Sequence, residues 1–179
     1  SLFIQNSYYM ENFKQTNLDD NILKAISEMG FETPTSVQAK TIPHLLNTDT
    51  DLIATAQTGT GKTASFTLPM IDILSSGRAG ARMPRSLILT PTRELATQIA
   101  ENFEIYGKYN KLTMALLIGG VSMDEQTKKL DRGVDVLIAT PGRLIDILRN
   151  CPSVGLEQLE VLVLDEAVRL GTAGRRRGR

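Results

Sequence analysis

The fold of this chain is constrained most by one glycine-rich segment, Ala56-Gln57-Thr58-Gly59-Thr60-Gly61-Lys62-Thr63. The segment follows a short apolar run, 51–55, and precedes a stretch that is compatible with a helix. A strand, a glycine-rich turn, Lys-Thr and a helix in this order form the phosphate-binding P-loop. The glycines let successive backbone N–H groups turn toward phosphate oxygens, and the helix N-terminus adds the positive end of its dipole. The segment therefore predicts an α/β fold that binds phosphate groups beyond the end of a strand.

Two polar residues at the end of this segment and two acids late in the chain carry the expected chemistry. Lys62 supplies a mobile cation for the β- and γ-phosphates, and the Thr63 hydroxyl is a ligand for Mg²⁺. Asp165 and Glu166 follow the apolar run Val161–Leu164. In a phosphoryl-transfer site, Asp165 would hold Mg²⁺ through its water shell and Glu166 would orient the attacking water. The alternative is that both acids only end a strand or cap a helix.

Short apolar runs alternate with longer helical patterns from residue 51 onward. Near-continuous apolar strands separated by helices predict a parallel sheet with helices on both faces. Before residue 51 the sequence predicts two helices, because Gly30 provides a helix stop and Pro34 a helix start. The expected strands are Leu52–Ala56, Ser86–Thr90, Thr113–Ile118, Val136–Ala139 and Val161–Leu164, and the expected helices are 19–29, 35–47, 62–75, 93–108, 122–131 and 142–149, with a loop over 76–84.

The acidic segment reads Asp165-Glu166-Ala167-Val168 and resembles the signature motif of the DEAD-box RNA helicases. Val168 stands where that family has its second aspartate. The P-loop also resembles the form that the family uses, which accounts for Ala56 where the general pattern has glycine. The segment Gly30–Gln38 resembles the family's adenine-reading Q motif, and Phe13 stands seventeen residues before Gly30, where the family keeps an isolated aromatic residue. The resemblance covers residues 13–169 and implies that the nucleotide is ATP.

Gln38 and Phe13 are the residues that the resemblance assigns to adenine. The Gln38 amide can donate one hydrogen bond and accept another, which matches N7 and the N6 amino group of adenine. The Phe13 ring can stack on the base. The alternatives are that Gln38 is an exposed polar residue on a helix and that Phe13 is a core side chain. The expected cofactor-binding residues are Phe13, Gln38, Ala56, Gln57, Thr58, Gly59, Thr60, Gly61, Lys62 and Thr63, the catalytic residues are Glu166, Asp165 and Lys62, and the metal ligands are Thr63 and Asp165.

Three further segments resemble the family's RNA-backbone motifs. Each follows an expected strand, so hydroxyls, backbone N–H groups and guanidinium donors gather at one edge of the sheet and suit a sugar-phosphate chain. Thr92 and Thr140 are equally suited to cap helices, and the two roles are compatible because helix N-termini bind phosphate. The expected RNA-binding residues are Pro91, Thr92, Arg93, Gly119, Gly120, Thr140, Pro141, Gly142 and Arg143.

The overall charge does not argue for a nucleic-acid partner, because 20 basic residues balance 20 acidic ones. The last eleven residues hold five of the arginines and no acid, which leaves residues 1–168 with a net charge of about −5. RNA binding must therefore depend on local sites. The one cysteine, Cys151, allows no internal disulfide, and no apolar run reaches the ~20 residues that span a bilayer. We expect a monomeric, cytoplasmic protein without membrane contact.

The resemblance implies one RecA-like ATP-binding domain over 51–169, with the helices of 1–50 as an extension of the same domain. The stretch 170–179 predicts a disordered basic tail, which fits either an RNA-binding tail or sequence that is not native to the protein. The implied function is that of the N-terminal domain of an ATP-dependent RNA helicase, which needs an absent second RecA-like domain for hydrolysis and unwinding. The alternatives are a different P-loop ATPase and a fragment that binds RNA or a partner and holds ATP without turnover.

Replacing Lys62 with alanine should weaken the binding of ATP and ADP far more than that of adenosine. Lys62 is assigned to the phosphates, so the loss of affinity should grow with the number of phosphate groups. Titration calorimetry with adenosine, ADP and ATP measures the three losses. An equal loss for all three ligands would point to misfolding instead of a lost phosphate contact.

Overall fold

The computed structural model of the protein describes residues 9–49, 61–76 and 83–165, and these fall into two compact units. Unit 1 comprises 1–79 and 102–112, and unit 2 comprises 80–101 and 113–179. The expected strand Leu52–Ala56, most of the expected loop over 76–84 and the tail 170–179 lie outside the described residues, so these predictions and the predicted boundaries stay predictions. No helix within the described ranges is long and apolar enough to cross a membrane.

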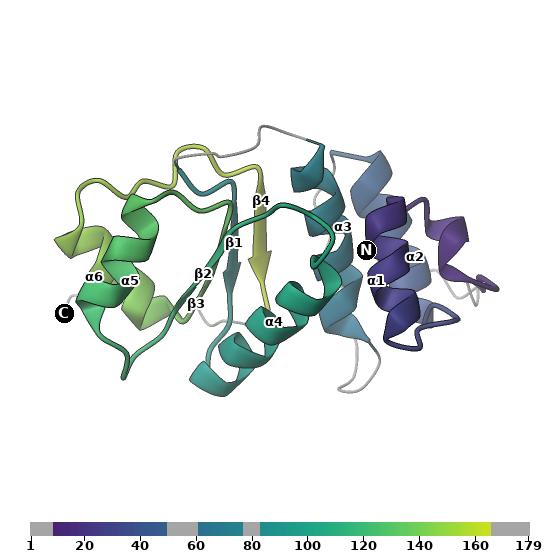
Figure 1. The fold of residues 1–179 in the computed structure, drawn as a ribbon, viewed down its shortest axis with the longest axis horizontal. Helices are drawn as coiled ribbons and strands as arrows, with labels where there is room; N and C mark the ends of the chain where they lie inside the picture. The colour runs from purple at the N-terminus through teal and green to yellow at the C-terminus, as the bar shows by residue number, and fades with distance from the viewer. Residues whose placement is uncertain (1–8, 50–60, 77–82, 166–179) are drawn as a thin grey trace, which may run out of the picture. The chain divides into compact units, whose positions relative to one another are not determined.

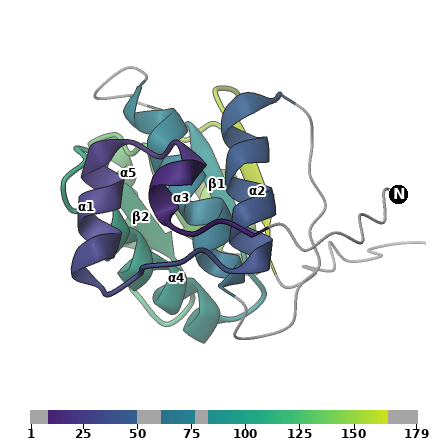
Figure 2. The same ribbon diagram turned by 90° about the vertical axis from the view of Figure 1, so that its right-hand side faces the viewer.

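The regular elements in the described residues of unit 1 are helices. They are η1 (Phe13–Thr16), which is a short 3-10 helix, α1 (Asp20–Glu28), α2 (Ser36–Asn47) and α3 (Lys62–Ser75). Helix α3 contacts both α1 and α2, and Figure 2 shows it between them. The helices predicted over 19–29, 35–47 and 62–75 are confirmed, and η1 is an addition to the predicted elements.

Side-chain caps determine where α1 and α2 begin. The Asp19 carboxylate accepts a hydrogen bond from Ile22 N at 3.0 Å, and the Thr35 hydroxyl accepts one from Gln38 N at 3.3 Å. Oε1 of Gln38 accepts in return from Thr35 N at 3.0 Å, which completes a capping box. Such caps replace the partners that the first N–H groups of a helix lack. The capped helices α1 and α2 and the helix α3 then bury their apolar sides, with exposures of 0–1% for Ile22, Ile26, Ile42, Leu68, Ile71 and Leu74.

A polar cluster on the surface of unit 1 joins α1 to residues 108–109. Glu28 accepts hydrogen bonds from Lys108 Nζ and Tyr109 Oη, and Lys24 Nζ lies 4.3 Å from the centroid of the Tyr109 ring. The hydrogen bond from Lys108, aided by that from Tyr109, lowers the pKa of the Glu28 carboxyl. The same carboxylate raises the pKa of Lys108 and of Tyr109. Because the cluster is exposed, water screens it and it contributes little to stability.

Unit 2 contains a four-stranded parallel sheet (Figure 1). Its strands are β1 (Ser86–Leu89), β2 (Met114–Leu117), β3 (Val136–Ala139) and β4 (Val161–Leu164), in the order β2-β3-β1-β4. Helices α4 (Arg93–Tyr106), α5 (Met123–Asp131) and α6 (Pro141–Asn150) follow β1, β2 and β3 in turn, and the last residues of α4 belong to unit 1. The strands and helices predicted for this part of the chain are confirmed, with ends shifted by at most two residues.

Both faces of β1 and β3 are buried. Alternate side chains of a strand point to opposite faces of the sheet. One set packs in a single apolar cluster with side chains of α5 and α6, and this cluster includes Leu87, Leu89, Leu137, Ala139, Leu130, Leu144 and Ile147. The opposite set, Ile88, Val136 and Ile138, is 0% exposed. The strand Val136–Ala139 is apolar at every position. Such a strand suits a parallel sheet that is covered on both faces.

A buried aspartate holds three strands together at the amino edge of the sheet. Asp135 is 2% exposed, and its Oδ2 accepts hydrogen bonds from the N–H and the hydroxyl of Thr113 at 2.9 and 3.1 Å. The carbonyl of Asp135 accepts from Arg85 N at 2.9 Å and from Ser86 N at 3.1 Å. Asp135 therefore joins the starts of β1 and β2 to the start of β3.

Replacing Asp135 with alanine should destabilise unit 2 by about 1.5–3 kcal/mol, because the N–H and hydroxyl of Thr113 lose a charged acceptor. Urea denaturation followed by circular dichroism measures the free energy of unfolding. Asp146→Ala is the matched control, because Asp146 is an exposed aspartate on α6. Its effect should stay within about 0.5 kcal/mol. Equal losses in the two variants would contradict the role given to Asp135.

Candidate functional site

The first group of predicted site residues lies where α3 begins. Gly61 is the N-cap of α3 and has φ +77° and ψ +23°, a left-handed conformation that glycine adopts without steric cost. Lys62 and Thr63 are the first two residues of α3, and both are half-buried. A left-handed turn before a helix N-terminus directs N–H groups toward an anion. The other residues of the predicted loop, 56–60, lie outside the described residues.

Gln38 connects the Q-like segment to this turn. It is 4% exposed, and its Nε2 donates a hydrogen bond to the carbonyl of Gly61 at 3.2 Å while its Oε1 accepts from Thr35 N. A Cβ at position 61 would lie 2.3 Å from Gln38 Nε2, so the close contact requires glycine there. The alternative that Gln38 is an exposed polar residue is therefore wrong. The amide keeps a second donor on Nε2 and a second lone pair on Oε1.

Phe13 is a core residue of unit 1. It is 5% exposed, and its ring stacks on Phe31 with the centroids 6.0 Å apart and 27° between the planes. Phe31 in turn faces Tyr106, with the centroids 6.0 Å apart. The alternative that Phe13 is a core side chain is confirmed, and its stacking on adenine stays a prediction.

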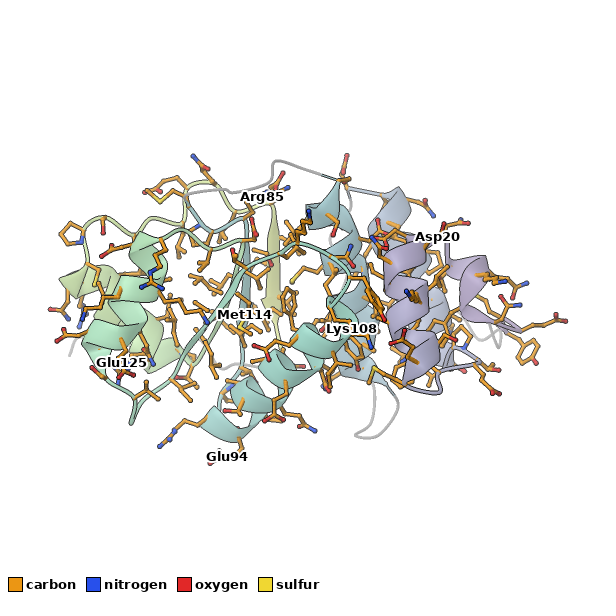
Figure 3. The ribbon with its side chains drawn as sticks, viewed as in Figure 1. Asp20, Arg85, Glu94, Lys108, Met114 and Glu125 are labelled. Carbon is orange, nitrogen blue, oxygen red and sulfur yellow. The ribbon has the colours of Figure 1, made fainter. Side chains whose placement is uncertain are left out.

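In unit 2, the three segments that resemble RNA-backbone motifs follow neighbouring strands. The last residues of β1 and β2, Leu89 and Leu117, both pair with Ala139, the last residue of β3. Arg85 and Glu94, which are labelled in Figure 3, mark the amino and carboxyl sides of β1. Because parallel strands that end in register share an edge, the segments 91–93, 119–120 and 140–143 all begin at the carboxyl edge of this sheet.

The two threonines at this edge differ in what their hydroxyls do. Thr92 Oγ1 accepts a hydrogen bond from Leu95 N at 3.2 Å and so caps the start of α4. Thr140 is the N-cap residue of α6 but makes no capping hydrogen bond through its side chain within the described residues, and Pro141 follows it at the start of the helix. Its N–H donates to the carbonyl of Leu117 at 3.1 Å. The capping alternative is therefore confirmed for the Thr92 hydroxyl and wrong for the Thr140 hydroxyl.

The segment 119–123, which comprises most of the link from β2 and the first residue of α5, approaches both arginines of the predicted RNA-binding set. Gly120 has φ +80°, and a Cβ built on it would lie 2.8 Å from Arg93 Nη1. Arg143 donates a hydrogen bond from Nη1 to the sulfur of Met123 at 3.6 Å. This short segment thus lies close to two guanidinium groups, that of Arg93 on α4 and that of Arg143 on α6.

Asp165 follows β4 at the same edge of unit 2. It is 5% exposed, and its N–H donates to the carbonyl of Leu89 at 2.9 Å, so sheet pairing fixes its backbone. The carboxylate of Asp165 is an oxygen donor of the hard type that Mg²⁺ prefers, and so, considered by itself, is the hydroxyl of Thr63 in unit 1. Glu166 lies outside the described residues.

The family model described as DEAD/DEAH box helicase matches residues 35–178. This chain belongs to the DEAD/DEAH box helicase family. The resemblance that the sequence motifs indicated is therefore confirmed.

Relatives of this DEAD-box chain are much longer than the chain itself. The probable ATP-dependent RNA helicase ddx27 of Dictyostelium discoideum is 45% identical over 161 residues, which are 90% of this chain and 20% of the relative. The probable ATP-dependent RNA helicase DDX27 of Homo sapiens is 45% identical over 166 residues, which are 92% of this chain and 22% of the relative. The chain thus spans about one fifth of the length of these relatives.

Two solved DEAD-box structures share the fold. The yeast DEAD-box splicing factor Prp28 aligns with a TM-score of 0.79 and 36% identity over 89% of this chain and 39% of its own. A DEAD-box protein from Methanococcus jannaschii aligns with a TM-score of 0.78 and 38% identity over 87% of this chain and 41% of its own. The predicted RecA-like α/β fold, a parallel sheet with helices, is confirmed.

Two residues that support the carboxyl edge of this DEAD-box domain are absent from the predicted set. Gln126 is 5% exposed and donates from Nε2 to the carbonyl of Ile118 at 3.0 Å, which holds the chain just after β2. Gln126 and Leu130 are four residues apart and share the buried side of α5. A polar residue on such a side needs an internal partner, and this pattern is a signal for it. Met123 carries no comparable signal, because a methionine on a helix is typical of a core position.

Thr92→Ala should destabilise the protein by about 0.5–2 kcal/mol, because Leu95 N loses its side-chain acceptor at the start of α4. Thr140→Ala should cost much less, because the Thr140 hydroxyl makes no such bond. The pair is matched, since each threonine precedes a helix that follows a strand of the same sheet. Chemical denaturation of the two variants measures the difference. Equal losses would contradict the distinction between the two hydroxyls.

Proposed function

We propose that this chain is the N-terminal ATP-binding domain of an ATP-dependent RNA helicase and that it binds ATP with Mg²⁺ and the RNA backbone. Membership of the family and the names of the relatives support this class of function. One observation carries the nucleotide part of the proposal, the hydrogen bond from Gln38 Nε2 to the carbonyl of Gly61. This bond joins the residue assigned to the base to the turn assigned to the phosphates.

Gln38 contacts the base with the second donor of Nε2 and the second lone pair of Oε1. The bonds to Thr35 and Gly61 hold the two ends of the amide, so donor and acceptor cannot exchange places. Adenine presents one acceptor and one donor to such a pair, whereas guanine presents two acceptors, N7 and O6. Guanine would therefore leave Oε1 without a partner.

Lys62 neutralises the β- and γ-phosphates, and Thr63 and Asp165 contribute oxygen ligands for Mg²⁺. When bound, Mg²⁺ neutralises charge on the phosphoryl oxygens. Glu166 orients the attacking water. Each of these roles uses a residue type that phosphoryl-transfer sites use for the same purpose.

RNA binds along the carboxyl edge of unit 2. Phosphate and ribose suit the guanidinium groups of Arg93 and Arg143 and the hydroxyl of Thr140, which caps no described helix. Contacts to phosphate and ribose carry no information about the base sequence. Gly119, Gly120 and Gly142 allow the sugar-phosphate chain to approach the backbone closely. Binding should therefore weaken steeply with salt and depend little on base sequence.

Hydrolysis and unwinding belong, in this proposal, to the whole protein, in which a second RecA-like domain completes the site. An arginine finger from such a domain is worth about 10³–10⁵ in rate. Val168 also replaces an acid with a side chain that accepts no hydrogen bond. The chain alone should therefore bind nucleotide and turn it over very slowly.

The chain should bind ADP more tightly than GDP by about 1–3 kcal/mol, because guanine offers no hydrogen-bond donor to Oε1 of Gln38. Titration calorimetry with the two diphosphates measures the difference. Equal affinities would remove the base-reading role from Gln38.

Gln38→Glu is the matched variant for this test. It keeps the shape of the side chain and an acceptor for Thr35 N but has no donor for Gly61 or for N7 of adenine. Its preference for ADP over GDP should disappear. A variant that keeps the full preference would show that another residue reads the base.

A further inference from the structure

The guanidinium of Arg93 occupies the space that a Cβ on Gly120 would need. A Cβ built on Gly120 would lie 2.8 Å from Arg93 Nη1, 3.1 Å from its Cζ and 3.1 Å from its Nη2. Gly119, the preceding residue, has nothing within 4 Å of such an atom. The close approach is therefore specific to position 120.

The three distances also indicate how the guanidinium is turned. A point in the guanidinium plane, beyond the two terminal nitrogens, would be clearly farther from Cζ than from either nitrogen. The distance to Cζ is shorter than an in-plane point would have, so the built Cβ lies out of the guanidinium plane, obliquely beyond the two terminal nitrogens. A guanidinium that a glycine approaches from out of its plane keeps its N–H donors, which lie in the plane, directed along the surface. Arg93 is exposed, so these donors are accessible to a ligand.

We propose that Gly120 is a positioning residue that seats the Arg93 guanidinium and so directs its N–H donors toward an RNA phosphate. The inference rests on the proposed RNA-binding function of the same edge. It assigns to Gly120 a role through Arg93 that is separate from any contact of its own backbone with RNA. Phosphate recognition by a planar, forked donor gains from fixed orientation, because less side-chain freedom is lost on binding.

Two features of position 120 bear on the effect of a substitution there. Its φ of +80° is a left-handed conformation, which strains a residue with a Cβ. The contact with Arg93 is the second feature, and it concerns the end of a flexible side chain. An added methyl group would displace the guanidinium at little cost to the fold, so its effect should appear in RNA binding more than in stability.

The test is a double-mutant cycle on the whole chain with Gly120→Ala, Arg93→Ala and the combined variant. The ligand is a fluorescein-labelled oligouridylate, and anisotropy gives the affinity at several salt concentrations. The Arg-rich stretch after residue 168 is common to all variants and cancels in the comparison. Gly133→Ala is the control for backbone strain, because Gly133 also has a left-handed φ, +85°, and lies at the other end of α5 in unit 2.

Arg93→Ala should weaken RNA binding about tenfold, the value of one charge-assisted hydrogen bond. Gly120→Ala should weaken it by a similar factor, and the combined variant should bind no more weakly than Arg93→Ala. Both single variants should lower the slope of log K against log salt by about 0.7, as expected for one lost phosphate contact on a single strand. Gly133→Ala should leave affinity and slope unchanged.

A second measurement reads the contact without RNA. In ¹H–¹⁵N spectra, the Nε–H resonance of Arg93 should shift in Gly120→Ala and stay in place in Gly133→Ala. An unshifted resonance would overturn the proposed contact.

The outcomes separate this inference from the function on which it rests. If Arg93→Ala weakens binding but Gly120→Ala does not, or if the two factors multiply in the combined variant, Gly120 does not act through Arg93 and the inference fails alone. If Arg93→Ala leaves RNA affinity unchanged, the proposed RNA contact of Arg93 fails and the inference fails with it.

Discussion

The aligned ends of β1, β2 and β3 are the constraint on which the candidate RNA edge depends. Each strand is followed by a turn and a helix, so alignment of the strands also aligns the first residues after them. Asp135 contributes from the opposite end, because it ties the starts of the same three strands together. A slip of one residue in a single strand would move its motif away from the other two and put each of its side chains on the opposite face of the sheet.

In unit 1, the single side chain of Gln38 has several structural roles. One side chain completes the capping box of α2, fills a buried position and donates to the carbonyl of Gly61. The turn that is proposed to bind phosphate is thus attached at Gly61 to the helix that carries Gln38, the residue proposed to read the base. A change at Gln38 should therefore alter the start of α2 and the turn together, which is why the conservative Gln38→Glu variant is more informative than alanine.

Gly61 and Gly120 each combine a left-handed backbone with the close approach of a side chain that the sequence predicts to bind a ligand. Gly61 adjoins the amide of Gln38, and Gly120 adjoins the guanidinium of Arg93. Gly30 and Gly133 have the same kind of φ at the ends of helices, where a left-handed residue ends the helix. Gly30 has nothing within 4 Å of a Cβ built on it, although its φ of +82° is similar. The difference between Gly30 and the pair Gly61 and Gly120 therefore depends on which side chains the fold brings near.

The sequence by itself determined the type and order of the described α-helices and strands, although not the short 3-10 helix η1, because hydrophobic periodicity and helix caps are local properties. It also located the motifs, since Gly61-Lys62-Thr63 and Asp165 are recognised by their spacing from a strand or helix. Tertiary structure decided the strand order, the burial of Gln38 and Phe13 and the contact between Arg93 and Gly120. These depend on contacts between residues far apart in the chain, which no local pattern records. For the same reason the sequence treated Thr92 and Thr140 alike, although only the first uses its hydroxyl to cap a helix.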